Sequence, residues 1–405
     1  MMMNSSGAPA DTARDLLLRL RDSPDLFAAI AACTPAERAN QKTLRSRFDD
    51  ELVRAALALD DARVRAKGRL PSAGQLWLTA TGLEQSTAPE VARHKAARFA
   101  ACNSVSDLCS GIGIDAAALS AVTSVEAFDL DPAMALRCQW NVELLGHSDR
   151  LKTTAADVTS HCWSGKFVHA DPDRRVGRDR PARRLEAYQP DLNWMQQLAT
   201  NAAGGAIKIG PASNFQQKFP GCEIELVSLA GECREATVWF GELAGESSFR
   251  ATCLDTGESV AGDPLSAWAD QATDLGHWLI DPDPAIVRSG LLDLLAETHQ
   301  LQRLDPEEEY LTADRVPETG FVTGFQVEAI LPGNPRELSR YFRSRPASEY
   351  EIRCRRIPLN ADALRKKLPA GTHPPAVVVA CRINGRSRFV IARRGLAANT
   401  AVQED

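Results

Sequence analysis

The 405-residue sequence has no apolar run close to the ~20 residues that a membrane-spanning helix requires. Its first residues, Met1 to Ser6, lack the basic segment and apolar core of a secretory signal. Glycine (26 residues) and proline (23 residues) occur at ordinary frequencies, which excludes collagen-like chains and wholesale disorder. We therefore expect a soluble cytoplasmic protein that does not bind membranes, and the length suggests two or three domains.

Cysteine pairs of the kind that bind zinc are also missing. No two of the ten cysteines form a Cys-x-x-Cys pair, and the seven histidines show no ligand spacing around them. We therefore predict no metal site. In the absence of a secretory signal, we expect the thiols to stay reduced and to serve as small, buried apolar side chains.

Charge is distributed unevenly along the chain, whose formal net charge is −6. Residues 336–394 contain fifteen Lys and Arg residues but only four Asp and Glu residues, a local excess of +11. The remainder therefore carries −17. This asymmetry indicates a basic module that meets a polyanion, carried on an acidic body. The alternative is a basic face that contacts only water.

The apolar spacing predicts several elements in the first 245 residues. Residues 1–80 form a helical region, and Thr87 to Glu90 fit a capping box before a helix at 91–101. After residue 101, strand-like and helical periods alternate, which predicts an α/β fold with a parallel sheet over residues 81–245. Strands are expected at 105–108, 122–128, 151–155, 167–170 and 206–209, helices at 116–121 and 134–145, and a final hairpin at 224–229 and 236–240.

The remaining residues read as a linker and a second domain. Residues 246–275 are polar and rich in Gly, Asp and Ser, so we interpret them as a linker or an irregular insertion. Residues 276–405 form a basic α+β domain. Its expected helices lie at 284–300 and 359–368, and its strands at 350–357, 377–383 and 389–392.

Glycines and acidic residues follow the first two strands of the predicted sheet. The segment Asp107 to Asp115 contains Gly111 and Gly113 in a strand-to-helix turn, where glycine lets the backbone approach a bound nucleoside cofactor. Asp129 comes sixteen residues after Gly113, at the end of the next strand. A carboxylate at that place can accept hydrogen bonds from both hydroxyls of a ribose. This loop alone also fits a dinucleotide fingerprint.

The next two strands also end in acidic residues. Asp157 follows the third strand, where it can meet an adenine amine, and the fourth strand runs into Asp171-Pro172-Asp173-Arg174-Arg175. Open parallel sheets bind ligands at the carboxyl ends of their strands. Because a nicotinamide enzyme needs neither the Asp-Pro at strand four nor the terminal hairpin, the whole series distinguishes this site from a dinucleotide site.

Through these motifs, residues 84–240 resemble a class I S-adenosylmethionine-dependent methyltransferase. The motifs that carry this resemblance are Asp107-x-x-x-Gly111-x-Gly113-x-Asp115, Asp129, Asp157 and Asp171-Pro172. More narrowly, residues 70–395 resemble bacterial methyltransferases with a C-terminal THUMP-like domain. The segments that match this group are 83–87, 171–175, 231–236, 283–291 and 310–312.

The resemblance implies a Rossmann-like sheet of seven strands and S-adenosylmethionine as the methyl donor. It also implies that Asp107, Gly111, Gly113, Asp115, Asp129 and Asp157 bind this cofactor. THUMP domains proper bind RNA, so the resemblance points to RNA as the partner, with tRNA and rRNA not distinguished. An N-terminal helical region would then precede the methyltransferase domain, and the basic THUMP-like domain would follow it.

We assign catalysis to Asp171, Asp173 and Arg174. Methyl transfer from a sulfonium is an in-line displacement, so the enzyme mainly positions the nucleophile, and Asp171 would orient or deprotonate it. Arg174 or Arg175 would neutralise a phosphate or a base oxygen. An ion pair between Asp173 and Arg174 within the loop is the alternative. In enzymes that methylate base amines, an aromatic residue usually follows Asp/Asn-Pro-Pro, and this chain has none at that place.

Basic residues in two regions are candidates for RNA contacts. A basic loop follows strand four, where exposed arginines suit a phosphate backbone and solvated side chains are the alternative. Tyr188, Trp194 and Phe215 would stack on bases or belong to the core. In the C-terminal region, alternation sends Arg353 and Arg355 to one face of their strand. The predicted RNA-binding residues are Arg175, Arg178, Arg353, Arg355, Arg356, Lys366 and Lys367.

We thus expect a methyltransferase that modifies structured RNA. Three alternatives stay open at this point. The chain could methylate a protein or a small molecule, it could be a nicotinamide-dependent oxidoreductase, or it could bind RNA without catalysis. The target nucleotide, the methylated atom and the oligomeric state are not determined by these motifs.

Overall fold

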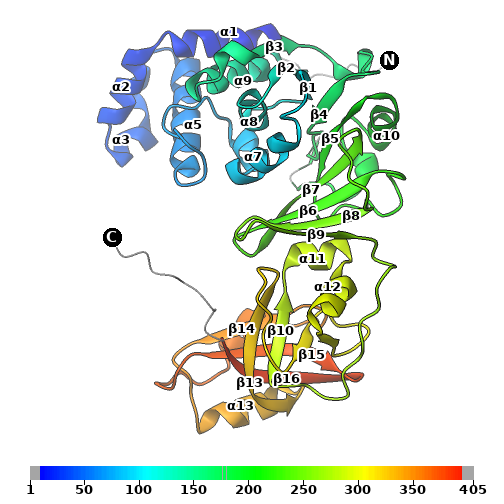
Figure 1. Ribbon diagram of the computed structural model, residues 1–405. Coiled ribbons are helices and arrows are strands. Elements are labelled where there is room, and N and C mark those ends of the chain that lie inside the picture. The colour runs from blue at the N-terminus through cyan, green and yellow to red at the C-terminus, as the bar shows by residue number, and fades with distance from the viewer. Residues whose placement is uncertain (1–9, 176, 179, 395–405) are drawn as a thin grey trace, which may run out of the picture. The chain divides into compact units, whose positions relative to one another are not determined.

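The computed structural model describes residues 10–175, 177–178 and 180–394 (Figure 1). The chain forms two compact units. The first contains the residues up to 222 together with 237–245, and the second contains 223–236 together with the residues from 246 onward. The boundary differs from the one expected after residue 245, because it passes through a single β-strand that contributes to both units.

The first unit begins with six helices, and all of them except α3 contribute side chains to one apolar core. Leu26, Ile30 and Val53 are fully buried in this core, which also includes Ile112 and Ile114 from the α/β region. The N-terminal helices therefore pack beside the glycine loop that follows the first strand. These helices are α1 (Ala10–Arg21), α2 (Pro24–Ala32), α3 (Pro35–Asn40), α4 (Lys42–Arg45), α5 (Asp50–Ala66) and α6 (Ala80–Gln85).

A parallel sheet forms the centre of the first unit. Its strands are β1 (Ser104–Leu108), β2 (Ser124–Asp129), β3 (Leu151–Ala155), β4 (Phe167–Ala170) and β5 (Gly204–Ile209), in the order β3-β2-β1-β4-β5. β5 is buried along its whole length, as is typical of a parallel strand with both faces covered. Leu108 pairs with both Phe128 and Ala170, so β1, β2 and β4 end at one edge.

Helices accompany these strands. Figure 1 shows α1 beside α9, and α9 in turn packs against β2 and β3. The helices of this region are α7 (Pro89–Arg98), α8 (Ile114–Ser120), α9 (Pro132–Leu144) and α10 (Leu192–Asn201), with short 3₁₀ turns at Ser148–Arg150, Val158–Ser160 and Leu185–Ala187.

The expected hairpin is present as β6 (Glu223–Leu229) and β7 (Glu232–Gly241). Hydrogen bonding continues the strand order as β5-β7-β6, followed by β8 (Phe249–Cys253) and β9 (Glu258–Gly262). β8 is parallel to β6, and β9 is antiparallel to β8. The order 3-2-1-4-5-7-6 confirms the predicted α/β class with a hairpin at the end of the parallel series.

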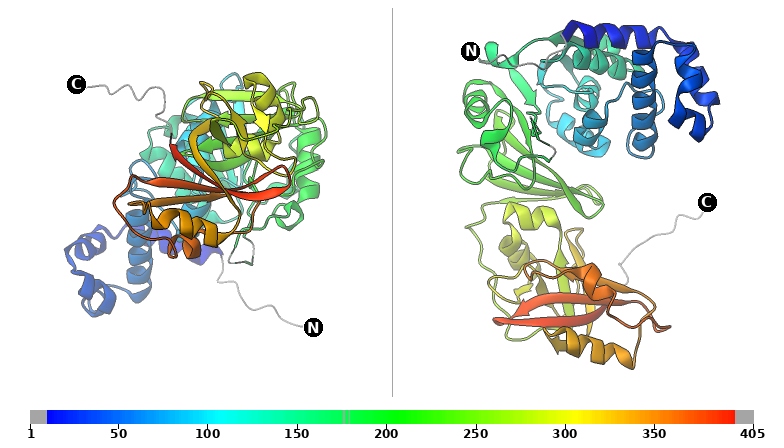
Figure 2. Two further views of the ribbon diagram at one scale, coloured as in Figure 1. Left: turned by 90° about the horizontal axis from the view of Figure 1, so that it is seen from below. Right: turned by 180° about the vertical axis from the view of Figure 1, so that it is seen from behind.

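The second unit contains another sheet, with the order β11-β12-β10-β13-β16-β15-β14. Figure 2 shows its last strands, in orange and red, side by side. Val377 and Val379 of β15 enter one core and Val378 and Ala380 enter another, so both faces of this strand are covered. The elements are β10 (Trp278–Pro282), α11 (Pro284–Ser289), α12 (Leu292–His299), β11 (Gln302–Arg303), β12 (Leu311–Ala313), β13 (Val322–Pro332), α13 (Pro335–Arg343), β14 (Tyr350–Cys354), α14 (Ala361–Arg365), β15 (Ala376–Ile383) and β16 (Arg386–Arg394).

Three expectations differ from the structure. The capping box expected at Thr87 to Glu90 is not formed, because α7 begins after Ala88 with no side-chain cap. Residues 245–275 are not wholly irregular, because they contain β8 and β9, and the strand periodicity of β8 is hidden by polar residues that pair with β6. The expected helix at 284–300 is divided into α11 and α12. Gly290 ends α11 with a φ of +79°, a left-handed conformation that glycine adopts without strain.

The close approach of β4 and β5 depends on Gly205. A Cβ atom at this position would lie 2.1 Å from the carbonyl oxygen of Val168 and 2.7 Å from the ring of Phe240. We therefore expect Gly205→Ala to destabilise the first unit by about 1–3 kcal/mol, because the strands must move apart. Urea unfolding followed by circular dichroism would measure this difference.

The matched control is Gly74→Ala, since a Cβ atom at Gly74 meets nothing within 4 Å. This variant should unfold at the same urea concentration as the parent protein. Equal stability of the Gly205→Ala and Gly74→Ala variants would contradict the proposed steric limit.

Candidate active site

The loop after β1 brings its backbone to the carboxyl edge of the sheet. Cys109, Gly111 and Gly113 all have positive φ angles, of 64°, 56° and 84°. A Cβ atom at Gly113 would lie 2.9 Å from the Cα atom of Cys138 in α9, so this glycine is required for packing. A Cβ atom at Gly111 would face open space. The loop is therefore held tightly on its α9 side and is open at Gly111.

Asp129, at the end of β2, is bound to this loop. Its Oδ2 accepts a hydrogen bond from the N–H of Gly111 at 2.9 Å, and its Oδ1 accepts one from the N–H of Asp131 at 2.9 Å. Burial raises the pKa of Asp129, although these two hydrogen bonds oppose the shift. Leu130, the next residue, is 67% exposed. A carboxylate and an exposed apolar side chain thus stand next to each other beside the open loop.

Asp157 lies in the next strand-to-helix connection and is exposed. Its Oδ1 accepts hydrogen bonds from the hydroxyl and the N–H of Thr159, at 2.7 and 2.9 Å, and these bonds lower the pKa of Asp157. The residue therefore caps the 3₁₀ turn that follows β3. A contact with an adenine amine stays a prediction.

Asp107 and Asp115 belong to a buried network of charged side chains beneath the loop. The Oδ1 of Asp107 lies 2.6 Å from Nδ1 of His169, whose Nε2 lies 3.3 Å from Nζ of Lys95. Lys95 also forms an ion pair with Asp115 at 3.0 Å, and the hydroxyl of Thr87 donates to Asp115 at 2.5 Å. We assign the proton of His169 to Nδ1, because an ammonium group donates to the other nitrogen.

Burial affects the two acids of this network differently. Burial raises the pKa of Asp107, and the nearby His169 only partly offsets that effect. Burial would also raise the pKa of Asp115, but Lys95, followed by His169, outweighs it and leaves the pKa well below its ordinary value. The ion pair with Lys95 therefore keeps Asp115 ionised between α7 and α8.

Asp171 follows β4 at the same edge of the sheet. Its N–H donates to the carbonyl of Leu108 at 3.0 Å, and its Oδ2 accepts from Nζ of Lys208 at 2.7 Å. Lys208 also donates to the carbonyl of Gln85 at 3.1 Å. Within the described part of the chain, no residue donates a hydrogen bond to the other oxygen, Oδ1. The carboxylate is thus fixed at one oxygen and available at the other.

Asp173, Arg174 and Arg175 make separate contacts. Asp173 accepts hydrogen bonds from the side chain of Gln85 at 2.7 Å and from the N–H of Arg175 at 2.8 Å, while the side chain of Arg175 pairs with Glu84. Arg174 lies beside Gly210 instead. Among the described residues, the alternative ion pair between Asp173 and Arg174 is not formed.

Sequence reasoning missed four residues that complete this edge: Lys95, Gln85, Lys208 and Thr87 as a ligand of Asp115. A signal existed for Lys208, because it is the one charged residue in the apolar strand Gly204–Ile209. Such a residue is costly to bury unless it is paired.

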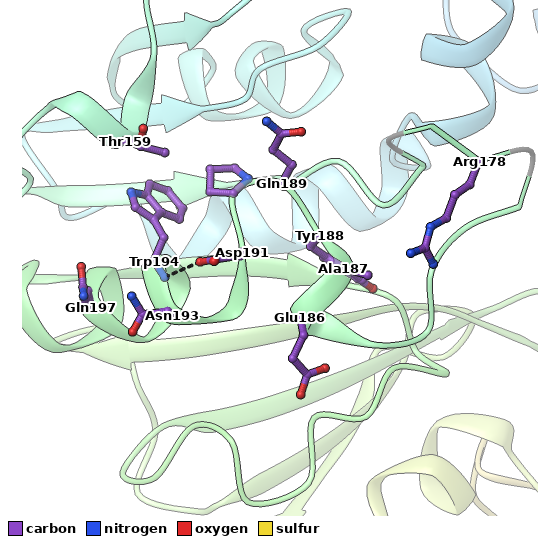
Figure 3. Close-up of a pocket in the computed structure, with 11 residues that line it drawn as sticks. Thr159, Arg178, Glu186, Ala187, Tyr188, Gln189, Asp191, Asn193, Trp194 and Gln197 are labelled. Atoms are coloured by element: carbon purple, nitrogen blue, oxygen red, sulfur yellow. Dashed lines mark hydrogen bonds between the residues drawn. The ribbon is translucent and has the colours of Figure 1, made fainter. Parts of the chain in front are cut away.

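The basic loop after Asp171 is exposed. Arg178, Arg180 and Arg183 lie on the surface and form no ion pair with any described residue. Of the aromatic candidates, Tyr188 and Phe215 are buried, whereas Trp194 is only partly buried. Trp194 lines an open pocket of about 550 Å³ that also contains Arg178 (Figure 3).

The basic residues of the second unit fall into two groups. Arg353 and Arg355 share one face of β14, as expected, but both form ion pairs with Asp281, and Arg356 pairs with Glu309. Their charges are therefore neutralised within the unit. Lys366 and Lys367 are exposed and pair with no described residue. RNA contacts by any of these five residues stay a prediction.

Comparisons with known proteins concern the family of the chain rather than single residues of the site. Two curated proteins of Mycobacterium tuberculosis, from strains CDC 1551 and H37Rv, are each 34% identical to this chain over 360 residues, covering 85% of this chain and 96% of theirs. Both are described as uncharacterized S-adenosylmethionine-dependent methyltransferases. This chain belongs to the S-adenosylmethionine-dependent methyltransferases.

Two further comparisons concern the fold. Residues 322–394 of this methyltransferase match the model of the THUMP domain-like family, which covers β13 to β16. A solved structure from Porphyromonas gingivalis W83, assigned as a methyltransferase, has a TM-score of 0.74 at 18% identity and covers 98% of this chain and 100% of its own. The α/β fold followed by a THUMP-like domain is therefore confirmed.

Two features are absent from the part of the chain that the structure describes. None of the helices formed by these residues combines the length and the apolar composition that a membrane span requires. In the same residues, no group of three or more His, Cys, Asp and Glu side chains is arranged to hold a metal ion.

Replacement of Lys95 tests the buried network. In a Lys95→Met variant, Asp115 loses its cation, so the protein should lose about 3–5 kcal/mol of stability at pH 7. Because the pKa of Asp115 is lowered in the folded protein, its stabilising contribution is fully present above the unfolded pKa and is lost only as the pH falls from there through the folded pKa. The contribution in the parent therefore changes little between pH 7 and 4. In the variant, the buried carboxylate without its cation can take up a proton as the pH falls, so the difference between the variant and the parent should shrink over that range.

Thermal unfolding across that pH range measures the effect. The control is Lys152→Met, which removes an exposed partner of Glu126 and should change the stability by less than about 1 kcal/mol. A Lys95→Met variant as stable as this control would show that the network does not hold α7 and α8 together.

Proposed function

We propose that this methyltransferase acts on RNA and that Asp171 orients the methyl acceptor. The observation that carries the proposal is the position of the basic loop. Three exposed arginines without partners among the described residues follow Asp171 by seven to twelve residues. Unpaired arginines beside a reacting centre favour a polyanionic substrate, because each can contact a phosphate at little desolvation cost.

The residues at the glycine loop fit S-adenosylmethionine. The open space at Gly111 leaves room for a ligand to approach the backbone, and Asp129 retains lone pairs for ribose hydroxyls. The exposed Leu130 offers an apolar surface to an adenine ring. Beneath the loop, the buried Oδ2 of Asp107 has no hydrogen-bond partner among the described residues, which suits a donor from an amino group or a bound water.

Within this cofactor site the acidic residues have different roles. Asp129 and Asp157 would contact the nucleoside, whereas Asp107 and Asp115 would act mainly by holding the loop through His169 and Lys95. S-adenosylmethionine, when bound, would supply a methyl group on a sulfonium, and in-line attack on the methyl carbon would break its bond to sulfur and release S-adenosylhomocysteine. All remaining tasks fall to the protein: binding, orientation and exclusion of water.

Asp171 would act through the oxygen that Lys208 leaves free. Lys208 holds Oδ2, so Oδ1 can accept a hydrogen bond from an N–H or O–H of the acceptor and direct its lone pair at the methyl carbon. Gln85 couples this position to the loop, since its carbonyl meets Lys208 and its side chain meets Asp173. Arg174, which pairs with no described acid, would neutralise charge on the substrate.

The second unit would add a docking surface. Its exposed Lys366 and Lys367 suit phosphate contacts, whereas Arg353 and Arg355 would support the fold through Asp281. A protein or small-molecule substrate is the second candidate, and RNA binding without catalysis is the third. Because this chain belongs to the S-adenosylmethionine-dependent methyltransferases, the nicotinamide-dependent oxidoreductase is no longer an alternative.

Two variants separate cofactor binding from methyl transfer. Asp129→Asn should weaken S-adenosylhomocysteine binding about tenfold or more, because a charged hydrogen-bond acceptor is lost. Asp171→Asn should retain that binding and lower methyl transfer by a factor of about 10² or more. Calorimetry measures the first effect. Transfer of labelled methyl to RNA from a strain that lacks this protein measures the second.

Asp149→Asn is the control for both measurements, because Asp149 is exposed and lies outside the site. Label in a protein or metabolite fraction instead of RNA would reject the RNA substrate and retain the enzyme class. Full transfer activity in Asp171→Asn would reject the role of Asp171.

The salt dependence of RNA binding tests the basic loop. Replacement of Arg178, Arg180 and Arg183 by Ala should reduce the slope of log affinity against log salt by about 2 to 3, since each phosphate contact contributes about 0.7 to 0.9. Fluorescence anisotropy with a labelled RNA hairpin between 50 and 200 mM salt measures this slope.

The matched control replaces three exposed arginines of the N-terminal helices, Arg45, Arg47 and Arg54, by Ala. It carries the same change of net charge and should leave the slope close to that of the parent. An equal change in both triple variants would indicate that only the net charge matters.

A further inference from the structure

A pocket lies beside the motif that carries Asp171. Its lining includes Thr159 after β3, the segment 186–191 and the first turns of α10 (Figure 3). One lining residue, Gln189, exchanges two backbone hydrogen bonds with Asp173, at 2.8 and 2.9 Å. The pocket wall is therefore attached to the segment that contains Asp171, within the first unit.

Trp194 gives this pocket an aromatic surface. Its side chain is partly buried, and its indole N–H makes no hydrogen bond to a described residue. Figure 3 shows Trp194 on the same side of the pocket as Thr159, with Arg178 on the opposite side. The backbone of Trp194 is fixed, because its N–H donates to Asp191 at 3.0 Å. A rigid aromatic ring that faces solvent can stack on a planar ligand.

The polar side chains of the pocket are available to a ligand. Asn193 and Gln197 are exposed beside Trp194 and form no hydrogen bond with a described residue. Each amide can both donate and accept, as the edge of a nucleobase requires. The other aromatic residue of the lining, Tyr188, is buried, and its hydroxyl is bonded to Ser213.

Two acidic residues in the lining are already engaged. Glu186 pairs with Lys218 and accepts a hydrogen bond from Asn214, and the bond from Lys218 is the largest cause that lowers the pKa of Glu186 to about 2. Asp191 caps α10. The positive charge of Arg178 is not matched by a described acid. The pocket therefore combines a ring, two amides and a guanidinium group that pairs with no described acid.

We propose that this pocket holds an unstacked nucleobase of the RNA substrate, with the base on Trp194 and its phosphate near Arg178. The proposal rests on the RNA substrate proposed above and adds a condition to it: the base must come from a single-stranded segment. A base in a duplex is stacked on both faces and cannot enter. The pocket would thus hold a nucleotide adjacent to the target and set the register of the RNA.

Binding of two RNA probes tests this pocket. The first probe is a fluorescein-labelled single-stranded 12-mer, and the second is the same strand annealed to its complement. Trp194→Ala should weaken binding of the single strand by about tenfold, because stacking of a base on an aromatic ring contributes about 1–3 kcal/mol. Trp194→Phe keeps an aromatic face and should stay within about threefold of the parent. Neither variant should change binding of the duplex.

The matched control is Trp268→Ala, which removes a tryptophan that is 77% exposed and lies outside the pocket. This control should bind both probes as the parent does. Thermal stabilisation by S-adenosylhomocysteine, measured on every variant, shows that the first unit is folded and that its cofactor site is intact.

Three results would overturn the proposal. The first is unchanged binding of the single strand by Trp194→Ala, and the second is an equal loss of affinity for the single strand and the duplex in that variant. The third is loss of its thermal stabilisation by S-adenosylhomocysteine, which would assign the pocket to the cofactor. Methyl transfer distinguishes this proposal from the substrate proposal. If the parent protein labels no RNA while Trp194 still governs single-strand binding, the pocket is supported and RNA methylation is not.

Discussion

The ion pair between Lys95 and Asp115 is the interaction on which the candidate active site, at the carboxyl edge of the parallel sheet, depends. Two oppositely charged groups are buried where a lone charge would be too costly, so each requires the other. Through His169 the pair reaches Asp107, and α7, α8, β1 and β4 are thereby joined at one point. The glycine loop above them packs tightly against α9 at Gly113, whereas a Cβ atom at Gly111 would face open space.

A second buried cation organises the acceptor side. Lys208 of β5 binds one oxygen of Asp171 and the carbonyl of Gln85 at the end of α6, so the sheet and the N-terminal helices meet at the motif. The two lysines have similar roles, because each neutralises an aspartate and leaves part of the site available. Charged residues thus hold this edge in place, while the apolar core supports it from below.

The two units differ in whether their candidate RNA-binding arginines form ion pairs with acidic residues. In the second unit, Arg353 and Arg355 are partly buried against Asp281, and the exposed Arg356 pairs with Glu309, so acids of that unit offset their charge. Arg178, Arg180 and Arg183, which follow Asp171, pair with no described acid. A count of basic residues therefore overestimates the charge that a substrate meets, since pairing depends on which acids the fold brings near.

The sequence by itself determined the α/β class, most strand positions and the acids at the strand ends, because hydrophobic periodicity and glycine turns are local signals. It also indicated the methyltransferase family through Asp107, Gly111, Asp129 and Asp171. Only the tertiary structure decided that Asp107 and Asp115 are buried, that Lys208 holds Asp171, and that β8 and β9 are strands. These outcomes depend on partners distant in sequence, such as Lys95 for Asp115 and β6 for β8, and no local pattern identifies such partners.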